Sequence, residues 1–292
     1  MNQLTTLRKP VLYYTAANLI CIFFVALLLQ FIIPQYAHSQ GNLLLMPRRV
    51  VFEGSKKYEE LNLANTGKDT ARYVISLMHL RMKEDGSFEE INEPGPGENF
   101  ADKFIRFFPR SVVLGPDESQ VIKIQLNRTS ELTPGEYRSH IYFRAIPNQA
   151  PLGEATPSKD STISVKLIPV FGISIPVIIR VGETDMQVSL SDPKVEIAED
   201  TIHVLNMTFN RNGNMSVYGD LAVNYISNEG KTISAGVIKG IAVYTPNQLR
   251  RFKLNLENHP GIDYRTGRLH IKYTTSTETQ STTLAETDLV LH

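Results

Sequence analysis

Apolar and polar residues alternate along most of this chain with the period of β-strands. From Gly41 onward, short runs rich in β-branched and aromatic residues are separated by Gly, Pro, Asn and Asp clusters, and no long stretch has helical spacing. This pattern predicts an all-β fold. The first series of expected strands covers residues 43–52, 59–64, 71–82, 104–108, 112–114, 120–126, 135–146 and 162–181.

A second series of strands is expected after Gly182. Turn signals such as Asn212-Gly213 and Pro260-Gly261 separate its members, and the Thr/Ser-rich stretch 274–283 is expected to be a loop or a solvated edge. Two such series indicate two immunoglobulin-like β-sandwich domains, at residues 40–182 and 183–292. The strands of the second series are expected at 186–190, 194–197, 203–210, 217–226, 233–244, 251–256 and 268–274.

The N-terminus has the features of an export signal. Arg8 and Lys9 precede an uncharged apolar run, residues 11–33, and the small residues Ala37 and Ser39 follow it. We predict a signal peptide, residues 1–39, cleaved after Ser39. The run is also long enough to span a bilayer, so an uncleaved anchor is the alternative. In either case the rest of the chain is exported.

Composition and motifs give little support to catalysis. The 30 basic residues equal the 30 acidic ones, which does not favour nucleic-acid binding, and the only cysteine, Cys21, lies in the leader. No two histidines have the spacing of a local metal site, and no Gly-x-Ser-x-Gly motif is present. We therefore expect neither an enzyme nor a cofactor or metal. An exported enzyme whose site combines residues distant in sequence remains an alternative.

Two features of the first domain indicate binding. Arg49 leads directly into the apolar strand Val50–Phe52, where a guanidinium beside a cleft can bind a carboxylate through two hydrogen bonds. The alternative is that Arg49 is a solvent-exposed charge at the edge of the sheet, and the spacing of the residues alone favours this alternative.

The second feature is the run from Ile163 to Arg180, in which the odd-numbered positions are almost all large and apolar. The period of a strand places Ile163, Val165, Leu167 and Phe171 on one face. An edge strand with such a row can accept a partner's strand, whereas an ordinary last core strand is the alternative.

Five motifs in order make residues 43–181 similar to the N-terminal domain of periplasmic chaperones of the chaperone–usher pathway, which assemble pili and fimbriae. The motifs are Arg49–Phe52, Leu61–Gly67, Pro109–Ile124, Tyr142–Pro147 and the apolar run 163–180. The resemblance implies a non-catalytic periplasmic protein whose partners are pilin or fimbrial subunits and an outer-membrane usher. It implies no nucleic acid, and membrane contact only through the N-terminal segment if that segment is uncleaved.

The resemblance also implies a mechanism, donor-strand complementation. The last strand of the first domain would fill the open groove of an incomplete subunit with Ile163, Val165, Leu167 and Phe171. By its place at the head of the first strand, Arg49 would anchor the subunit's C-terminal carboxylate.

This chain departs from the family pattern at two positions, as a divergent member would. A lysine of the carboxylate anchor is expected four residues before a late arginine; if that arginine is Arg180, Pro176 occupies the lysine's position, and Lys166 and Arg180 are the expected substitutes. An acid near the start of residues 137–141 is expected to be replaced by Arg138. The alternative function is a non-catalytic immunoglobulin-like envelope or adhesion protein anchored by residues 11–33.

Overall fold

The computed structural model describes residues 43–147, 170–199, 201–275 and 281–292. Their regular structure is β-strand apart from two 3-10 turns, Asp102–Phe104 and Thr129–Glu131, which confirms the predicted all-β fold class. No helix in these ranges is long and apolar enough to cross a membrane. The predicted signal peptide or anchor, residues 1–39, lies outside the described residues.

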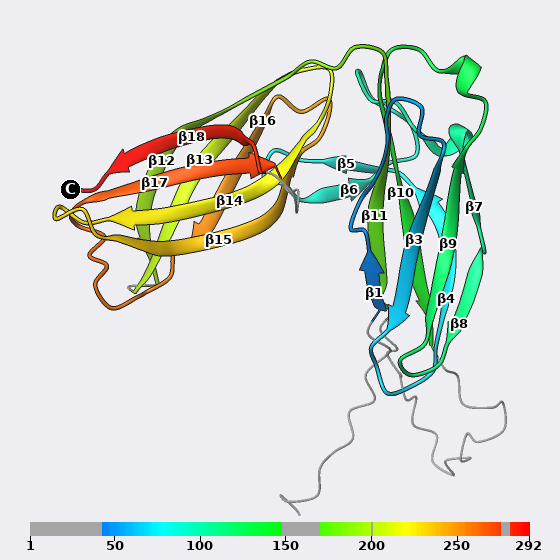
Figure 1. Ribbon diagram of the computed structural model, residues 1–292, viewed down its shortest axis with the longest axis horizontal. Helices are drawn as coiled ribbons and strands as arrows, with labels where there is room; N and C mark the ends of the chain where they lie inside the picture. Colours follow the sequence, from blue (N-terminus) through cyan, green and yellow to red (C-terminus); the bar gives the residue numbers. More distant parts are fainter. Residues whose placement is uncertain (1–42, 148–169, 200, 276–280) are drawn as a thin grey trace, which may run out of the picture. The chain divides into compact units, whose positions relative to one another are not determined.

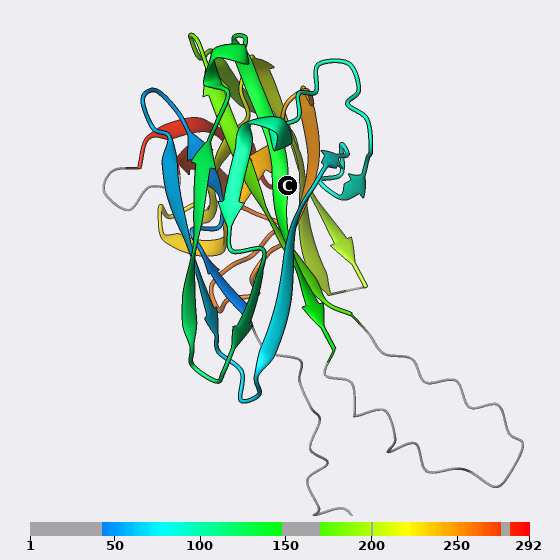
Figure 2. The same ribbon diagram turned by 90° about the vertical axis from the view of Figure 1, so that its right-hand side faces the viewer.

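The first sandwich consists of two sheets that lie face to face (Figures 1 and 2). One sheet contains, in spatial order, β1 (Leu43–Met46), β3 (Tyr58–Asn65), β9 (Ser119–Leu126) and β7 (Ile105–Phe108). The other contains β2 (Val50–Phe52), β11 (Gly172–Val181), β10 (Gly135–Ile146), β4 (Ala71–Met78) and β8 (Ser111–Leu114). Alternate residues of these strands face inward, so each buried Leu, Ile or Phe contributes about 1.5–3 kcal/mol to folding.

The predicted strand 43–52 is divided between the two sheets. Its first part, β1, pairs with β3 in one sheet, and its second part, β2, pairs in parallel with β11 in the other. The interruption falls at Pro47, which has no N–H for a ladder hydrogen bond. The chain therefore crosses from one layer to the other immediately before Arg49.

A short hairpin extends from β4. The turn at Asp85-Gly86 joins β5 (Leu80–Met82) to β6 (Phe88–Glu90), and Gly86 adopts the positive φ of 84° that the turn requires. Glu89 and Glu90 belong to β6. The hairpin contacts the second sandwich (Figure 1), since the Asn247 amide donates to the Met82 carbonyl at 2.8 Å.

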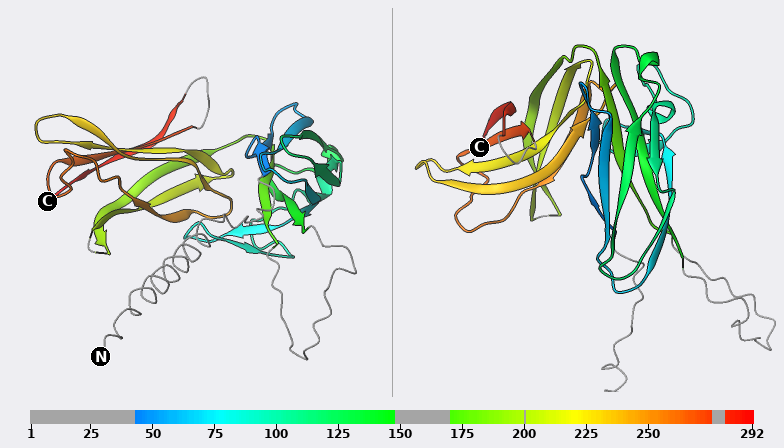
Figure 3. Two further views of the ribbon diagram at one scale, coloured as in Figure 1. Left: turned by 90° about the horizontal axis from the view of Figure 1, so that it is seen from below. Right: turned by 45° about the vertical axis from the view of Figure 1, so that its right-hand side comes forward.

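The second sandwich also has two sheets, with β12 and β13 in one layer (Figure 3). The first sheet contains β12 (Met186–Ala198), β13 (Ile202–Gly213) and β16 (Leu249–Asn255). The second contains β15 (Thr232–Val243), β14 (Val217–Ile226), β17 (Arg268–Thr275) and β18 (Thr283–Val290). The predicted strands 186–190 and 194–197 form the single strand β12, because a bulge between Ser191 and Lys194 accommodates the interruption.

Each sandwich has its own hydrophobic core. Buried residues of the first core lie between Leu45 and Ile179, and those of the second between Leu190 and Leu291. Two separate cores confirm the two-sandwich architecture. The exact domain boundary at residues 182 and 183 stays a prediction.

Candidate binding site

Strand β11 carries a row of apolar side chains that continues past the end of the core. Ile175, Val177 and Ile179 face the interior of the first sandwich and are buried. On the same face, Ile173 is 41% exposed and Phe171 is 62% exposed. At the N-terminal end of the strand, the apolar row that is buried further along is therefore exposed to solvent.

One edge of the same part of β11 has no partner strand in the part of the chain that the structure describes. Along its other edge, β11 pairs with β10 from Val181 to Gly172, and the Ala145 N–H extends this ladder to the Phe171 carbonyl at 2.9 Å. Strand β2 pairs only with Val177–Ile179. Within the described ranges, no strand pairs with Gly172–Pro176 on the β2 side.

The predicted donor-strand residues Ile163, Val165 and Leu167, together with the predicted anchor residue Lys166, lie outside the described residues. Of the predicted donor residues, Phe171 alone is described, and it lies at the open end of the apolar row. The roles assigned to all of them stay predictions.

The opposite face of the same sheet carries a group of cationic side chains. The parallel register of β2 and β11 places Arg49 beside Pro176, and the antiparallel register of β11 and β10 places His140 on the other side of Pro176. The next row across the sheet contains Ile178 and Arg138. Residues of one face alternate along each strand, so all five side chains lie on this face.

Glu136 and Arg180 form a buried ion pair on this face. The distance from Arg180 Nε to Glu136 Oε2 is 3.2 Å, and the Glu136 side chain is 1% exposed. The same oxygen accepts hydrogen bonds from the N–H and the hydroxyl of Ser216, both at 2.9 Å, and the other oxygen accepts one from the Thr245 hydroxyl at 3.0 Å. Four donors thus satisfy this carboxylate, and two of its partners belong to the second sandwich.

This ion pair revises an expectation from the sequence. The acid near the start of residues 137–141 was expected to be replaced by Arg138, but Glu136, two residues earlier, provides a carboxylate that connects the two sandwiches. Arg138 has a separate position, with its guanidinium over the ring of Tyr244 at 4.3 Å.

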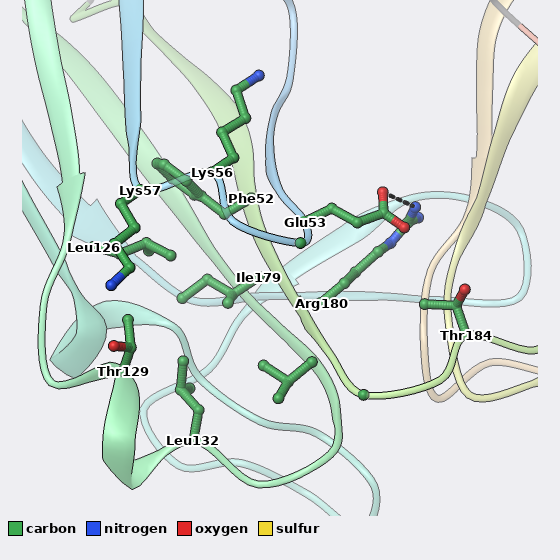
Figure 4. A pocket seen from close by; sticks show the side chains of 13 residues that line it. Phe52, Glu53, Lys56, Lys57, Leu126, Thr129, Leu132, Ile179, Arg180 and Thr184 are labelled. Atoms are coloured by element: carbon green, nitrogen blue, oxygen red, sulfur yellow. Dashed lines mark ion pairs between the residues drawn. The ribbon is translucent and has the colours of Figure 1, made fainter.

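Arg180 has little capacity left for a further anion. Its guanidinium also donates to the Ser216 carbonyl at 3.0 Å and lies 3.6 Å from the carboxylate of Glu53. Figure 4 shows Arg180 directed at Glu53 beside a pocket of about 510 Å³. The predicted anchoring role of Arg180 stays a prediction, but two carboxylates already balance its charge.

Arg49 and Arg138 differ from Arg180 because neither forms an ion pair with a described residue. The guanidinium of Arg49 lies over the ring of Tyr218 at 4.4 Å. Burial lowers the pKa of both Arg49 and Arg138 below the usual range, and the neighbouring Arg180 lowers that of Arg49 further. Arg138 is buried and Arg49 is half-buried, and the nearby carboxylate of Glu136 offsets part of the cost of burying their charges.

His140 makes stability depend on pH. Burial, with smaller effects of Arg138 and His79, lowers the pKa of His140 from 6.5 to about 3. The unfolded chain takes up a proton here below about pH 6.5, whereas the folded chain resists it until about pH 3. The contribution of neutral His140 to stability is therefore complete above about pH 6.5 and is lost as the pH falls toward 3.

As the pH falls from about 6 to about 4, the unfolded chain binds a proton at His140 and the folded chain does not. We expect this difference to lower the free energy of unfolding by about 1.4 kcal/mol for each pH unit. Urea unfolding at several pH values gives the free energy of unfolding as a function of pH, and this function should have a shallower slope in the variant His140→Asn. An unchanged slope in the variant would show that His140 titrates normally in the folded chain.

Sequence reasoning missed the tyrosines and the buried acid of this site. Tyr218 and Tyr244 belong to the second sandwich, where alternation predicts strand residues but not which of them contact the first sandwich. Glu136 follows Pro134-Gly135 at the start of β10, so a charged residue directly after a turn signal was the available indication.

No protein-family model matches the chain. No curated protein sequence matches it either. Similar solved structures include the CupB2 chaperone of Pseudomonas aeruginosa, with 12% identity over 85% of this chain and 100% of that chain and a TM-score of 0.41. The E. coli chaperone DraB has 15% identity over 87% of this chain and 98% of that chain, with a TM-score of 0.40.

A third similar structure is the CsuC–CsuE chaperone–tip adhesion subunit complex from the archaic chaperone-usher Csu pili of Acinetobacter baumannii. The identity is 13% over 84% of this chain and 97% of the matched chain, with a TM-score of 0.43.

Proposed function

We propose that this protein is a periplasmic chaperone that binds pilus or fimbrial subunits by donating a strand and delivers them to an outer-membrane usher. The observation that carries the proposal is the N-terminal end of β11, where exposed Phe171 and Ile173 continue the inward-facing apolar row. Among the described residues, no strand pairs with the second edge of β11 at Gly172–Pro176. The ordered chaperone-like motifs of residues 43–181 and the export signal of the sequence support it.

The binding step follows from the properties of an edge strand. Backbone N–H and C=O groups of the open edge pair with a strand of the subunit, and this pairing supplies affinity that does not depend on side-chain identity. The alternating apolar side chains enter the subunit's groove and fix the register, since a shift by one residue would turn all of them to the other face. The protein forms and breaks no covalent bond in this step.

Arg49 is proposed to hold the C-terminal carboxylate of the subunit. Its guanidinium lies on the same sheet, has no ion-pair partner among the described residues, and is positioned by the Tyr218 ring. With its C-terminal carboxylate held by Arg49 and one of its strands paired with β11, the subunit would bind at one defined position along β11.

The experiment that tests the proposal is co-purification. The full chain with a C-terminal tag is exported together with small secreted proteins encoded beside it, and the retained proteins are identified by mass spectrometry. We expect a small β-rich subunit in a 1:1 complex. Recovery of the chain alone, stable and monomeric, would contradict the proposal and favour the structural envelope protein.

A matched pair of variants tests the strand itself. Phe171→Asp should weaken subunit binding at least about tenfold, because the loss of one buried phenylalanine amounts to about 1.5–3 kcal/mol. Phe108→Asp is the control, since Phe108 is 74% exposed and ends β7 in the other sheet. Equal effects of the two substitutions on the dissociation constant would argue against donation by β11.

A further inference from the structure

We infer that the pocket of Figure 4 binds a medium-chain organic acid, with the carboxylate at Lys57 and the aliphatic chain over an apolar wall. The volume of this pocket, hereafter the Lys57 pocket, is about 510 Å³, and small-molecule sites typically have volumes of about 300–1,000 Å³. Arg49 does not line the Lys57 pocket, and binding there is separate from the proposed capture of a subunit.

The apolar wall of the pocket comes from the interior of the first sandwich. Phe52 on β2 and Ile179 on β11 belong to the hydrophobic core, and they line the pocket together with Leu126, the last residue of β9. Leu132 and Val181 pack partly against the same core and are half-exposed at the pocket. An aliphatic chain bound here removes water from this apolar surface, which is favourable.

Three cationic side chains line the pocket, and only one of them has an unbalanced charge. Lys56 forms an ion pair with Glu59, and Arg180 lies between two carboxylates. Lys57 forms no ion pair with a described residue. The pocket therefore carries one positive charge that an anion can balance.

The hydroxyl of Thr129 provides a second donor near this charge. Figure 4 shows the ammonium group of Lys57 directed toward Leu126 and Thr129, whereas that of Lys56 points the other way. The Thr129 hydroxyl has no hydrogen-bond partner in the part of the chain that the structure describes. An ammonium group with three N–H donors and a hydroxyl with one O–H donor can together bind both oxygens of a carboxylate.

Backbone hydrogen bonds hold these groups in place before a ligand binds. The Leu126 N–H donates to the Lys57 carbonyl at 3.0 Å, just before β3 begins. At the end of the loop that carries Thr129, the Thr133 N–H donates to the Tyr137 hydroxyl at 3.1 Å. A site whose walls are already fixed loses less conformational entropy on binding.

The charge and the wall together select the class of ligand. One free ammonium group balances a carboxylate, whereas a phosphate monoester carries a charge of about −1.5 to −2. The single aromatic ring at the pocket, Phe52, is only 1% exposed, so the accessible part of the wall is mainly aliphatic. These properties fit a carboxylate with an aliphatic chain better than a phosphate, a stacked sugar or an aromatic acid.

The test is a titration of sodium octanoate into the full chain, with the backbone amide signals of Thr129 and Leu132 followed by nuclear magnetic resonance. We expect saturable shifts of both signals. Octanamide, which has the same chain without the charge, should bind at least about fivefold more weakly. Butyrate, which lacks four methylene groups, should bind at least about tenfold more weakly than octanoate.

Two neighbouring lysines provide a matched pair of variants. Lys57→Met keeps an unbranched apolar side chain and should lower the affinity for octanoate at least about fivefold, whereas Lys57→Arg should keep most of it. Lys56→Met is the control. Lys56 lines the same pocket but already pairs with Glu59, so its loss should leave the affinity within about twofold of wild type.

Equal binding of octanoate and octanamide, shifts that do not saturate, or equal affinities of the Lys57→Met and Lys56→Met variants would overturn the assignment. Vesicles of phosphatidylglycerol distinguish a free acid from a lipid: association of the chain with the vesicles, without saturable shifts by octanoate, would also overturn it. None of these measurements uses a subunit. Saturable shifts that depend on Lys57 would therefore support the site even if the co-purification captures no subunit.

Discussion

Replacing Glu136 with alanine is expected to lower the free energy of unfolding by about 3–5 kcal/mol, because it leaves the buried Arg180 guanidinium without its nearest counter-ion. The substitution also removes the acceptor of the Ser216 and Thr245 hydrogen bonds, which connect the two sandwiches. Denaturant unfolding of the full chain measures the change.

Glu53→Ala is the matched control for this prediction. Glu53 also lies near Arg180, at 3.6 Å, but its side chain is 52% exposed. Exposed ion pairs contribute about 0–1 kcal/mol, so the control should change stability by no more than that. Similar losses in the two variants would show that burial of Glu136 does not determine its contribution.

Arg49→Ala is expected to weaken subunit binding by about 2–5 kcal/mol, which corresponds to roughly thirty-fold to several-thousand-fold in the dissociation constant. The fold should not lose stability to the same extent, because Arg49 has no ion-pair partner among the described residues and removing it also removes a half-buried charge. Binding is measured with the purified subunit, and stability by thermal unfolding.

Arg48→Ala provides the control for Arg49. Arg48 is the preceding residue and is exposed, so its loss should leave the affinity within about twofold of wild type. A subunit that binds the Arg49 variant normally would place its anchor elsewhere in the chain. Loss of binding in both variants would indicate a general effect of positive charge at the start of the first strand.

The strands with clear alternation were predictable from the sequence to the residue. The bounds of β10 (Gly135–Ile146) and β14 (Val217–Ile226) agree with the expected runs. Burial alternates with period two along the whole of β14, but only in the C-terminal half of β10, where Ile141, Phe143 and Ala145 are buried. Strand β18 (Thr283–Val290) was not predicted. All of its residues are half-buried or exposed, so its sequence shows no clear alternation of apolar and polar positions. β6 is too short for a period to be seen.

The candidate site could be predicted only in part. Arg49 and Phe171 were identifiable because each has a local signal: a cation beside an apolar strand, and an apolar row of period two. The ion pair of Glu136 with Arg180 and the positions of Arg138 and His140 around Pro176 depend on strand register between β10 and β11. A single sequence does not contain that register.

Site-specific photo-cross-linking from position 171 tests donation by β11 most directly. The photoreactive residue p-benzoylphenylalanine is placed at Phe171 in one variant and at Phe108 in another, and each is exported with the captured subunit. We predict a covalent chaperone–subunit product from position 171 and none from position 108, with the cross-linked peptide of the subunit lying in a strand. A product from position 108 alone, or none from either position while the complex forms, would contradict donation by β11.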